Sequence, residues 1–262
     1  MHSEHICAVI PAAGRGTRLG LDVPKILAPI GGDCTVWTLL RDSLTGYVGH
    51  IHVVISPASL DVVQRAVTVG PHPERISVGV QERPLGMGDA IFSAAETWQE
   101  FDQLLVVWGD QAGLSSETLR RVIALHASGS GPRCTLPVVE AERPYVQYLF
   151  EDGSLECVRQ VREGAVVDER GFSDVGVFLL EVEGLQEAWR QYARIAAAGA
   201  VTGEANFLPF LVYLSQECGW RFDKVLVADP SEARGINTQE DLTFFQQRWA
   251  TPAHSVTCER EA

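Results

Sequence analysis

The chain has 262 residues, of which 46% are hydrophobic, and this suits one large α/β domain or a domain with a smaller lobe. Its formal net charge of -13, from 21 Lys and Arg against 34 Asp and Glu, argues against nucleic acid or an anionic membrane as a partner. No apolar signal segment opens the chain and no apolar run approaches the length of a membrane span, so we expect a cytoplasmic protein. The six cysteines show no C-x-x-C pattern, which favours free thiols in a reducing compartment.

The first half of the chain alternates short apolar runs with amphipathic stretches. A β-branched run at 6–10 is typical of a buried parallel strand, and similar runs predict strands at 51–55, 76–80 and 104–108. Apolar residues at helical spacing predict helices at 35–44 and 57–69. Strands that alternate with helices indicate a parallel sheet with helices on both faces.

The pattern changes after about residue 130. Four runs joined by short turns predict a mixed or antiparallel part of the sheet, which forms one wall of a cleft: 134–139, 146–151, 155–161 and 172–180. The remaining expected elements are helices at 185–198 and 206–218, a strand at 221–227, and a helix at 238–249 that Thr238 opens. Residues 251–262 form a polar tail, so one domain is expected to span 1–250.

A loop of small residues, glycines and arginines follows the first strand. Small residues let a backbone approach a ligand closely, and consecutive N–H groups together with cationic side chains can bind phosphate oxygens. No Gly-Lys-Ser/Thr closes the loop, so it is no P-loop, and Leu19 replaces the third glycine of a Rossmann fingerprint. The loop suits a nucleoside triphosphate, with these candidate residues: Ala12, Ala13, Gly14, Arg15, Gly16, Arg18 and Lys25.

Two oxygen-bearing side chains are candidate Mg²⁺ ligands. Asp110 follows the apolar run that ends at Trp108, and open α/β sheets bind ligands beyond the carboxyl ends of their strands. The alternative is that Gly109-Asp110 is a turn that caps a helix starting near Ser115. Asn237 is the candidate second ligand, although asparagine is also a common cap or turn residue.

The segment 81–90 follows the third predicted strand and carries candidate base-binding residues. The amide of Gln81 offers both a donor and an acceptor, which fits the edge of a pyrimidine base. Gly86 lets the backbone approach the base or ribose. Asp89 fits either a helix cap or a ribose contact, and we favour the cap.

Five strings occur in the same order as in bacterial N-acetylglucosamine-1-phosphate uridylyltransferases, members of the sugar-phosphate nucleotidyltransferase family. They are the glycine loop with Lys25, Gln81 with Leu85-Gly86, Gly109-Asp110, Gly203-Glu204, and Gly235-Ile236-Asn237. Together they cover roughly residues 6–245, and we expect no acetyltransferase β-helix of the kind that often follows this domain.

This resemblance implies a Rossmann-like nucleotidyltransferase fold: a mostly parallel mixed sheet with helices on both faces and a smaller antiparallel acceptor-binding part. It implies a nucleotide-binding half at about 6–130 and an acceptor-binding half at about 131–237. It also implies that Arg18 and Lys25 contact the triphosphate as catalytic residues, that Gln81 and Gly86 contact the base, and that Asp110 with Asn237 binds Mg²⁺.

The acceptor side departs from the family pattern. Gln160 stands where the family has a glutamate, and Asp174-Val175-Gly176 replaces an Asn-Thr-Gly string. Met87 replaces a common threonine. We expect Gln160, Asp174 and Glu204 to bind the acceptor, whose identity these departures leave open.

The sequence therefore predicts an Mg²⁺-dependent nucleotidyltransferase that joins a nucleoside triphosphate, with UTP favoured through Gln81, to a sugar 1-phosphate or similar phosphorylated acceptor. Pyrophosphate is released and an NDP-sugar type product forms. One alternative is a CTP-dependent cytidylyltransferase acting on an alcohol phosphate or phosphonate. Another is a non-catalytic nucleotide-binding regulator. The oligomeric state is not readable from the sequence.

Overall fold

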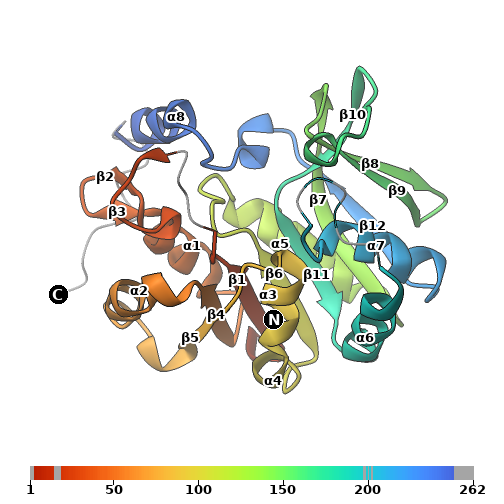
Figure 1. The fold of residues 1–262 in the computed structure, drawn as a ribbon, viewed down its shortest axis with the longest axis horizontal. Helices are drawn as coiled ribbons and strands as arrows, with labels where there is room; N and C mark the ends of the chain where they lie inside the picture. Colours follow the sequence, from red (N-terminus) through yellow and green to blue (C-terminus); the bar gives the residue numbers. More distant parts are fainter. Residues whose placement is uncertain (1–2, 15–18, 197–198, 200, 202, 251–262) are drawn as a thin grey trace.

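A computed structural model of the chain describes residues 3–14, 19–196, 199, 201 and 203–250 (Figure 1). Within these residues ten strands form one mixed sheet in the order β5-β4-β1-β6-β11-β7-β10-β8-β9, and β12 pairs with β7 beside this path. The expected polar tail at 251–262 lies outside the described residues. The fold expected from the sequence, a mixed sheet with a Rossmann-like parallel part and helices on both faces, is confirmed.

The amino-terminal part of the sheet is parallel. Its strands are β1 (Ile6–Pro11), β4 (His50–Ile55), β5 (Ile76–Val80) and β6 (Gln103–Val107). Parallel neighbours need crossover connections, and helices supply them here. These helices are α1 (Val36–Leu44), α2 (Leu60–Val67), α3 (Met87–Ser93) and α4 (Ala95–Trp98). The parallel pairing brings the carboxyl ends of β1, β4, β5 and β6 to one edge of the sheet.

The second part of the sheet is largely antiparallel and lies to the right in Figure 1. Its strands are β7 (Arg133–Glu142), β8 (Val146–Glu151), β9 (Ser154–Gln160), β10 (Arg170–Asp174), β11 (Val177–Glu181) and β12 (Arg221–Leu226). β11 pairs antiparallel with β6 and so joins the two parts, while β12 runs parallel to β7.

The single strand predicted at 172–180 is wrong, because the structure divides it into β10 and β11. Gly176 separates the two strands with a φ of 78°, a conformation that ends a strand and that glycine adopts without a steric penalty. The amide of Gly176 donates to Oδ1 of Asp174 at 2.7 Å, which fixes the turn. The break leaves Asp174 at the end of β10.

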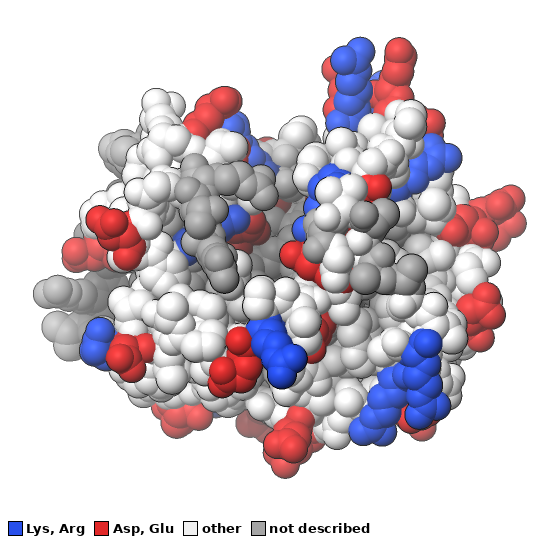
Figure 2. Space-filling view, in the orientation of Figure 1, with Lys and Arg blue, Asp and Glu red and all other residues white. Residues whose placement is uncertain are grey.

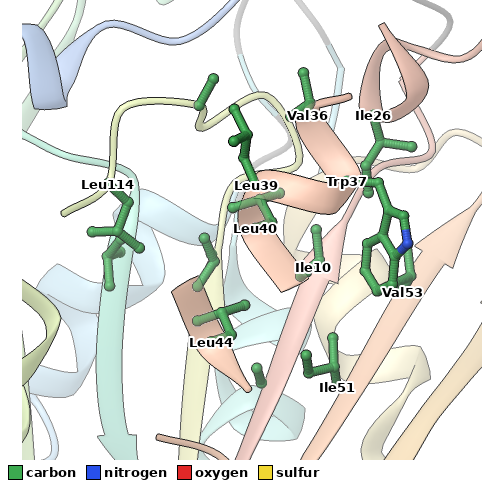
Figure 3. Close-up of a cluster of buried hydrophobic side chains, with 14 of the residues drawn as sticks. Ile10, Ile26, Val36, Trp37, Leu39, Leu40, Leu44, Ile51, Val53 and Leu114 are labelled. Atoms are coloured by element: carbon green, nitrogen blue, oxygen red, sulfur yellow. The ribbon is translucent and has the colours of Figure 1, made fainter. Parts of the chain in front are cut away.

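The hydrophobic core lies on both faces of the sheet, because successive strand residues point to opposite sides. On β1, Ile6, Ala8 and Ile10 pack in one cluster, while Cys7 and Val9 pack in the other. The first cluster includes residues of α1 and α2, of α5 (Ser116–Ala127) and of α8 (Gln239–Ala250), and Figure 3 shows α1 covering it. The second includes residues of α3, α4, α6 (Leu185–Ile195) and α7 (Phe207–Gln216).

Hydroxyl side chains open α1 and α5. Thr35 caps α1 in a capping box with Thr38, and Oγ of Ser115 accepts from the amide of Thr118 at the start of α5. The alternative that Gly109-Asp110 caps this helix is therefore wrong.

Elements that we did not predict are the hairpin of β2 (Pro29–Gly31) and β3 (Cys34–Thr35), and the helices α3 and α4.

Four described cysteines, Cys7, Cys134, Cys157 and Cys218, are free. Cys34 is disulfide-bonded, so the expectation of free thiols is wrong at that position. Among the helices that the structure describes, none has the length and apolar character needed to cross a membrane.

Candidate functional site

Two loops meet where β1 and β6 end at the same edge of the sheet. Because the two strands are parallel neighbours, the loop after β1 and Gly109-Asp110 after β6 leave the sheet side by side. A Cβ atom at Gly109 would lie 2.8 Å from the Cβ of Ala12, so glycine permits this close approach. The amide of Ala12 donates to the carbonyl of Val54 on β4 at 2.7 Å. These contacts hold the glycine loop beside Asp110.

The side chains of Lys25, Asp110 and Asn237 meet beyond this edge. The Nζ of Lys25 donates to Oδ2 of Asp110 at 3.1 Å and to Oδ1 of Asn237 at 2.9 Å. Lys25 opens the 3₁₀ turn η3 (Lys25–Leu27), and Asn237 lies just before α8, so the three residues come from distant parts of the chain. The structure thus brings together three residues that the sequence singled out.

The start of α8 fixes the backbone at Asn237. Oδ2 of Asp241 accepts from the amide of Asn237 at 3.0 Å and from the amide of Thr238 at 2.8 Å, and Oγ1 of Thr238 in turn accepts from the amide of Asp241. Partial burial acts to raise the pKa of Asp241, but hydrogen bonds from Arg234 and from these groups lower it overall. Thr238 therefore caps the helix, and the side chain of Asn237 is available to Lys25.

The oxygen atoms of Asp110 and Asn237 fit a divalent cation. The ammonium of Lys25 already occupies the point where both oxygens converge, so it acts as a stand-in for a cation there. No cluster of three or more His, Cys, Asp or Glu that could hold a metal ion occurs among the described residues. Mg²⁺ suits such a two-ligand site, because it takes one or two protein oxygens and completes its shell with phosphates and water.

A pocket of about 140 Å³, open to solvent, lies over Lys25 and Asp110. The surface is hollowed between the two parts of the molecule in Figure 2, with both acidic and basic side chains near the hollow. Trp108 and Met87 are among the lining residues that we had not assigned to the site. Trp108 packs against Phe178 and Phe207, at ring centroid distances of 5.0 and 5.9 Å. The lining residues are Pro11, Ala12, Gly14, Lys25, Ile26, Met87, Trp108, Gly109 and Asp110.

Gln81 is buried and its amide group shapes the loop that follows β5. Its Nε2 donates to the carbonyl of Gly86 at 2.9 Å and to Oδ2 of Asp89 at 2.7 Å. Both donors are therefore engaged within the protein, and no hydrogen bond to Oε1 is present among the described residues. The expectation that Asp89 caps a helix is wrong, because α3 begins at Met87 with Gly86 as its N-cap.

The segment around Glu204 packs directly on the loop of Gly86. A Cβ atom at Gly86, whose φ is 112°, would lie 2.8 Å from Cβ of Glu204 and 2.9 Å from the amide nitrogen of Ala205. That amide donates to the carbonyl of Leu85 at 2.7 Å, and the amide of Gly88 donates to the carbonyl of Ala205 at 3.0 Å. Two strings far apart in the sequence, Leu85-Gly86 and Gly203-Glu204, therefore form one contact.

The predicted acceptor residues lie on the antiparallel part of the sheet and the segment that leads into α7. Gln160 ends β9 and is 5% exposed, and Asp174 ends β10 and is 9% exposed. Burial raises the pKa of Asp174, while the Tyr148 hydroxyl and the Gly176 amide oppose this rise and the nearby charge of Asp110 adds to it. Asp174 is therefore close enough to Asp110 for the two charges to interact.

Glu204 belongs to a polar network centred on Arg162. The Nη2 of Arg162 donates to Oδ1 of Asn206 at 2.5 Å and to Oε2 of Glu204 at 3.3 Å. Glu163, beside Arg162 in the turn η6 (Val161–Glu163), accepts from the side chain of Asn206 at 3.3 Å. The sequence alone gave Asn206 and Glu163 no role, because their partners lie some forty residues away.

Two predicted residues of the glycine loop, Gly16 and Arg18, lie outside the described residues.

Comparison with known proteins matches residues 8–175 to a family model described as the MobA-like NTP transferase domain. The bifunctional protein GlmU of Kineococcus radiotolerans is 29% identical over 238 residues, which cover 89% of this chain and 47% of that protein. The bifunctional protein GlmU of Aquifex aeolicus is 27% identical over 251 residues. This chain thus spans about half the length of the curated relatives it matches, and the similarity confirms the resemblance drawn from the sequence.

Solved structures share the fold at low sequence identity. A Bacillus anthracis protein assigned as a glucose-1-phosphate thymidylyltransferase superimposes with a TM-score of 0.72 at 12% identity, over 93% of this chain and 94% of that one. The 4-diphosphocytidyl-2C-methyl-D-erythritol synthase of Anaerococcus prevotii superimposes with a TM-score of 0.66 at 14% identity, over 95% of this chain and 100% of that one. At these identities the likeness shows the fold alone.

Proposed function

This chain belongs to the MobA-like NTP transferase domain family and is a nucleotidyltransferase. On that premise we propose that it transfers a uridylyl group from UTP to a sugar 1-phosphate or similar phosphorylated acceptor, with Mg²⁺ as cofactor. One observation carries the proposal: Lys25, Asp110 and Asn237 converge at the strand edge where the glycine loop ends. The GlmU similarity supports the sugar phosphate class, and its coverage of the chain supports one catalytic domain at 1–250.

The proposal divides the chain by task. Residues 6–130 hold the triphosphate, with the backbone of Ala12, Ala13, Gly14 and Gly16 around its phosphates. Residues 131–237 hold the acceptor. The contact between the loop of Gly86 and the segment at Glu204 joins the two parts beside the pocket.

Asp110 and Asn237 would hold Mg²⁺, which supplies positive charge to the phosphate oxygens during transfer. The ammonium of Lys25, which contacts both of these side chains, would donate to the same phosphates and stabilise the charge that develops on the pentacoordinate phosphorus. Arg18 has the same proposed role. A phosphate oxygen of the acceptor attacks the α-phosphorus, the bond to the β-phosphate oxygen breaks, and pyrophosphate leaves. The protein needs no nucleophile of its own, since the acceptor phosphate is already one.

On the acceptor side, Gln160, Asp174 and Glu204 present hydrogen-bonding groups to the non-reacting part of the acceptor. Asp174 in place of an asparagine offers only acceptor oxygens when it is ionised. We therefore propose an acceptor that donates hydrogen bonds at this position, as hydroxyl groups of a sugar do. Trp108 supplies an apolar surface of the pocket.

A second candidate is CTP-dependent transfer to an alcohol phosphate or phosphonate. The hydrogen bonds of Gln81 are compatible with it. Because both donors of Gln81 are engaged, only Oε1 remains to contact a base. That oxygen can accept from N3–H of uracil or from the amino group of cytosine, so it serves either nucleotide.

The deciding experiment is an assay of pyrophosphate release with each common nucleoside triphosphate and Mg²⁺, against a panel of sugar 1-phosphates and alcohol phosphates. Release that requires UTP and a sugar 1-phosphate is the expected result. Release that requires CTP and an alcohol phosphate would replace it by the second candidate. No release with any pair, together with no rise in melting temperature on adding UTP or CTP, would contradict both and favour a non-catalytic regulator.

A further inference from the structure

The side chain of Gln111 directly follows Asp110 and is buried, at 3% exposure, between three segments of the chain. Its Nε2 donates to the carbonyl of Glu232 at 2.6 Å and to the carbonyl of Val175, and its Oε1 accepts from the amide of Gly113 at 2.8 Å. The two donors and the acceptor are all used. The amide orientation is unique, because the reverse would place Oε1 against two carbonyl oxygens.

Two of these partners belong to segments that carry residues of the proposed site. Val175 adjoins Asp174, and Glu232 lies in the 3₁₀ turn η7 (Pro230–Ala233), which leads to Asn237. A backbone bridge between Gln111 and Gly235 runs alongside, and the amide of Ile236 donates to the carbonyl of Asp110 at 3.0 Å. Gln111 is thus the side chain that links the two metal-facing segments to the turn on the acceptor side.

The turn that Gln111 holds is itself anchored. The carboxylate of Glu232, which is 6% exposed, accepts from the amide of Ser115 and from Oγ1 of Thr118, both at 3.0 Å. These groups form the start of α5, where the helix dipole stabilises a negative charge. The carbonyl to which Gln111 donates therefore belongs to a segment fixed on α5, so the amide of Gln111 has a rigid partner.

We propose that Gln111 is a positioning residue, which sets the distance and orientation of Asp110, Asn237 and Asp174 relative to one another, and this inference rests on the proposed function. In-line transfer requires the metal oxygens and the acceptor to be held within a fraction of an ångström. Side chains that orient metal ligands from outside the coordination shell typically change metal affinity or activity by about 10–100-fold when removed.

The test measures Mn²⁺ binding by electron paramagnetic resonance, with and without a non-hydrolysable UTP analogue, for the wild type and for Gln111→Met. The replacement keeps the volume and removes all three hydrogen bonds. The expected result is an affinity for Mn²⁺ in the analogue complex about tenfold weaker than that of the wild type, with a cooperative thermal melt retained. In the pyrophosphate assay, kcat should fall more than the KM for UTP rises.

Gln147→Met is the matched control. Gln147 is 2% exposed on β8, and its amide bonds Asp168 and Arg159 rather than the site. Equal Mn²⁺ affinity and equal kcat in the two variants would overturn the proposal. If the wild type neither binds Mn²⁺ with the analogue nor releases pyrophosphate, the proposed function fails instead.

A measurement on the wild type decides the matter if Gln111→Met does not fold. Adding Mg²⁺ and the analogue should slow hydrogen–deuterium exchange in peptides that cover Val175 and Glu232 as well as in those that cover Asp110. If exchange slows in the peptides that cover Asp110 but not in those that cover Val175 and Glu232, the positioning role is wrong.

Discussion

Lys25 occupies the place where a metal ion would bind, and this has a measurable consequence at the scale of one residue. Its ammonium donates to Asp110 and to Asn237, and under the proposed function a bound nucleotide would compete for it with its phosphates. We predict that Lys25→Met lowers kcat by at least ~100-fold, because a charged donor to the transition state is lost. The same change should strengthen Mn²⁺ binding in the absence of nucleotide, because a competing cation is removed. Activity assays and Mn²⁺ titrations would measure the two effects.

The chain provides a matched control for this variant. Its only other lysine, Lys224, lies over the rings of Phe150 and Phe172, at 5.0 and 5.5 Å from their centroids. Lys224→Met should leave both kcat and Mn²⁺ affinity near the wild-type values. Weaker Mn²⁺ binding by Lys25→Met without nucleotide would contradict the view that the ammonium competes with the metal.

Asp110 carries the only carboxylate that contacts Lys25 within the described residues. Asp110→Asn keeps the shape of the side chain and removes its charge, so the Mg²⁺ concentration that gives half-maximal rate should rise by more than ~10-fold. Asp102→Asn is the control, because Asp102 precedes the opposite end of the same strand, β6, and is 73% exposed. An unchanged Mg²⁺ profile in Asp110→Asn would remove the metal assignment.

The sequence indicated some of these residues and not others for a physical reason. Asp110 stands next to a run of apolar residues whose strand character is local, so its place at a strand end could be predicted. Gln111, Arg162 and Trp108 gain their surroundings from segments 40 to 120 residues away. No local pattern encodes such contacts.

At the scale of elements, local periodicity predicted the strands at 6–10, 51–55, 76–80 and 104–108 and the helices at 35–44 and 57–69, with boundaries shifted by at most three residues. It failed at β10 and β11, because the residues on both sides of Gly176 are compatible with one strand. Only the fold shows that β10 pairs with β8 while β11 pairs with β6. The hairpin of β2 and β3 was also missed, since its strands have only three and two residues.

The contact between the loop of Gly86 and the segment at Glu204 joins elements from the two parts of the chain. Gly86→Ala would place a Cβ atom against Glu204 and Ala205 at a positive φ, so we expect a loss of roughly 1–3 kcal/mol in the free energy of unfolding and a higher KM for UTP. Urea denaturation and the pyrophosphate assay would measure these changes.

Gly131→Ala separates the effect of the positive φ from the effect of the collision between the added Cβ atom and its neighbours. Gly131 has a φ of 77°, and a Cβ atom there meets nothing within 4 Å. This variant therefore carries the backbone strain without the collision, and it should lose stability with KM for UTP unchanged. Identical effects of the two alanine variants on KM would show that the contact between the loops does not matter for nucleotide binding.

At the scale of the whole molecule, the sheet is continuous from β5 to β9, and buried polar groups lie where its two parts join. His126 on α5 contacts Oγ1 of Thr135 through Nδ1 at 2.9 Å and Glu181 on β11 through Nε2 at 3.0 Å. Burial lowers the pKa of His126 to about 4, the charge of Arg133 acts in the same direction, and Asp223 opposes it. Burial similarly lowers the pKa of His52 to about 4.

These two histidines predict that the protein loses stability in mild acid. A histidine in the unfolded chain takes up its proton near pH 6.5, whereas His126 in the folded chain does so only near pH 4, so the unfolded state binds more protons between these values. The free energy of unfolding therefore falls as the pH drops from 6.5 to 4, by roughly 3 kcal/mol for His126 alone. Glu181 opposes part of this fall, because burial raises its pKa.

Urea denaturation at several pH values, in the wild type and in His126→Gln, tests this prediction. The variant cannot take up the proton, so its stability should decrease less steeply between pH 6.5 and 4, even if it is less stable at pH 7. His72→Gln is the control, because His72 is 53% exposed and only pairs with Glu74 at the surface. Its pH dependence should match that of the wild type. If the free energy of unfolding falls equally steeply with pH in His126→Gln and in the wild type, acid destabilises the fold through other groups. His52 would then be the first of these groups to test by substitution.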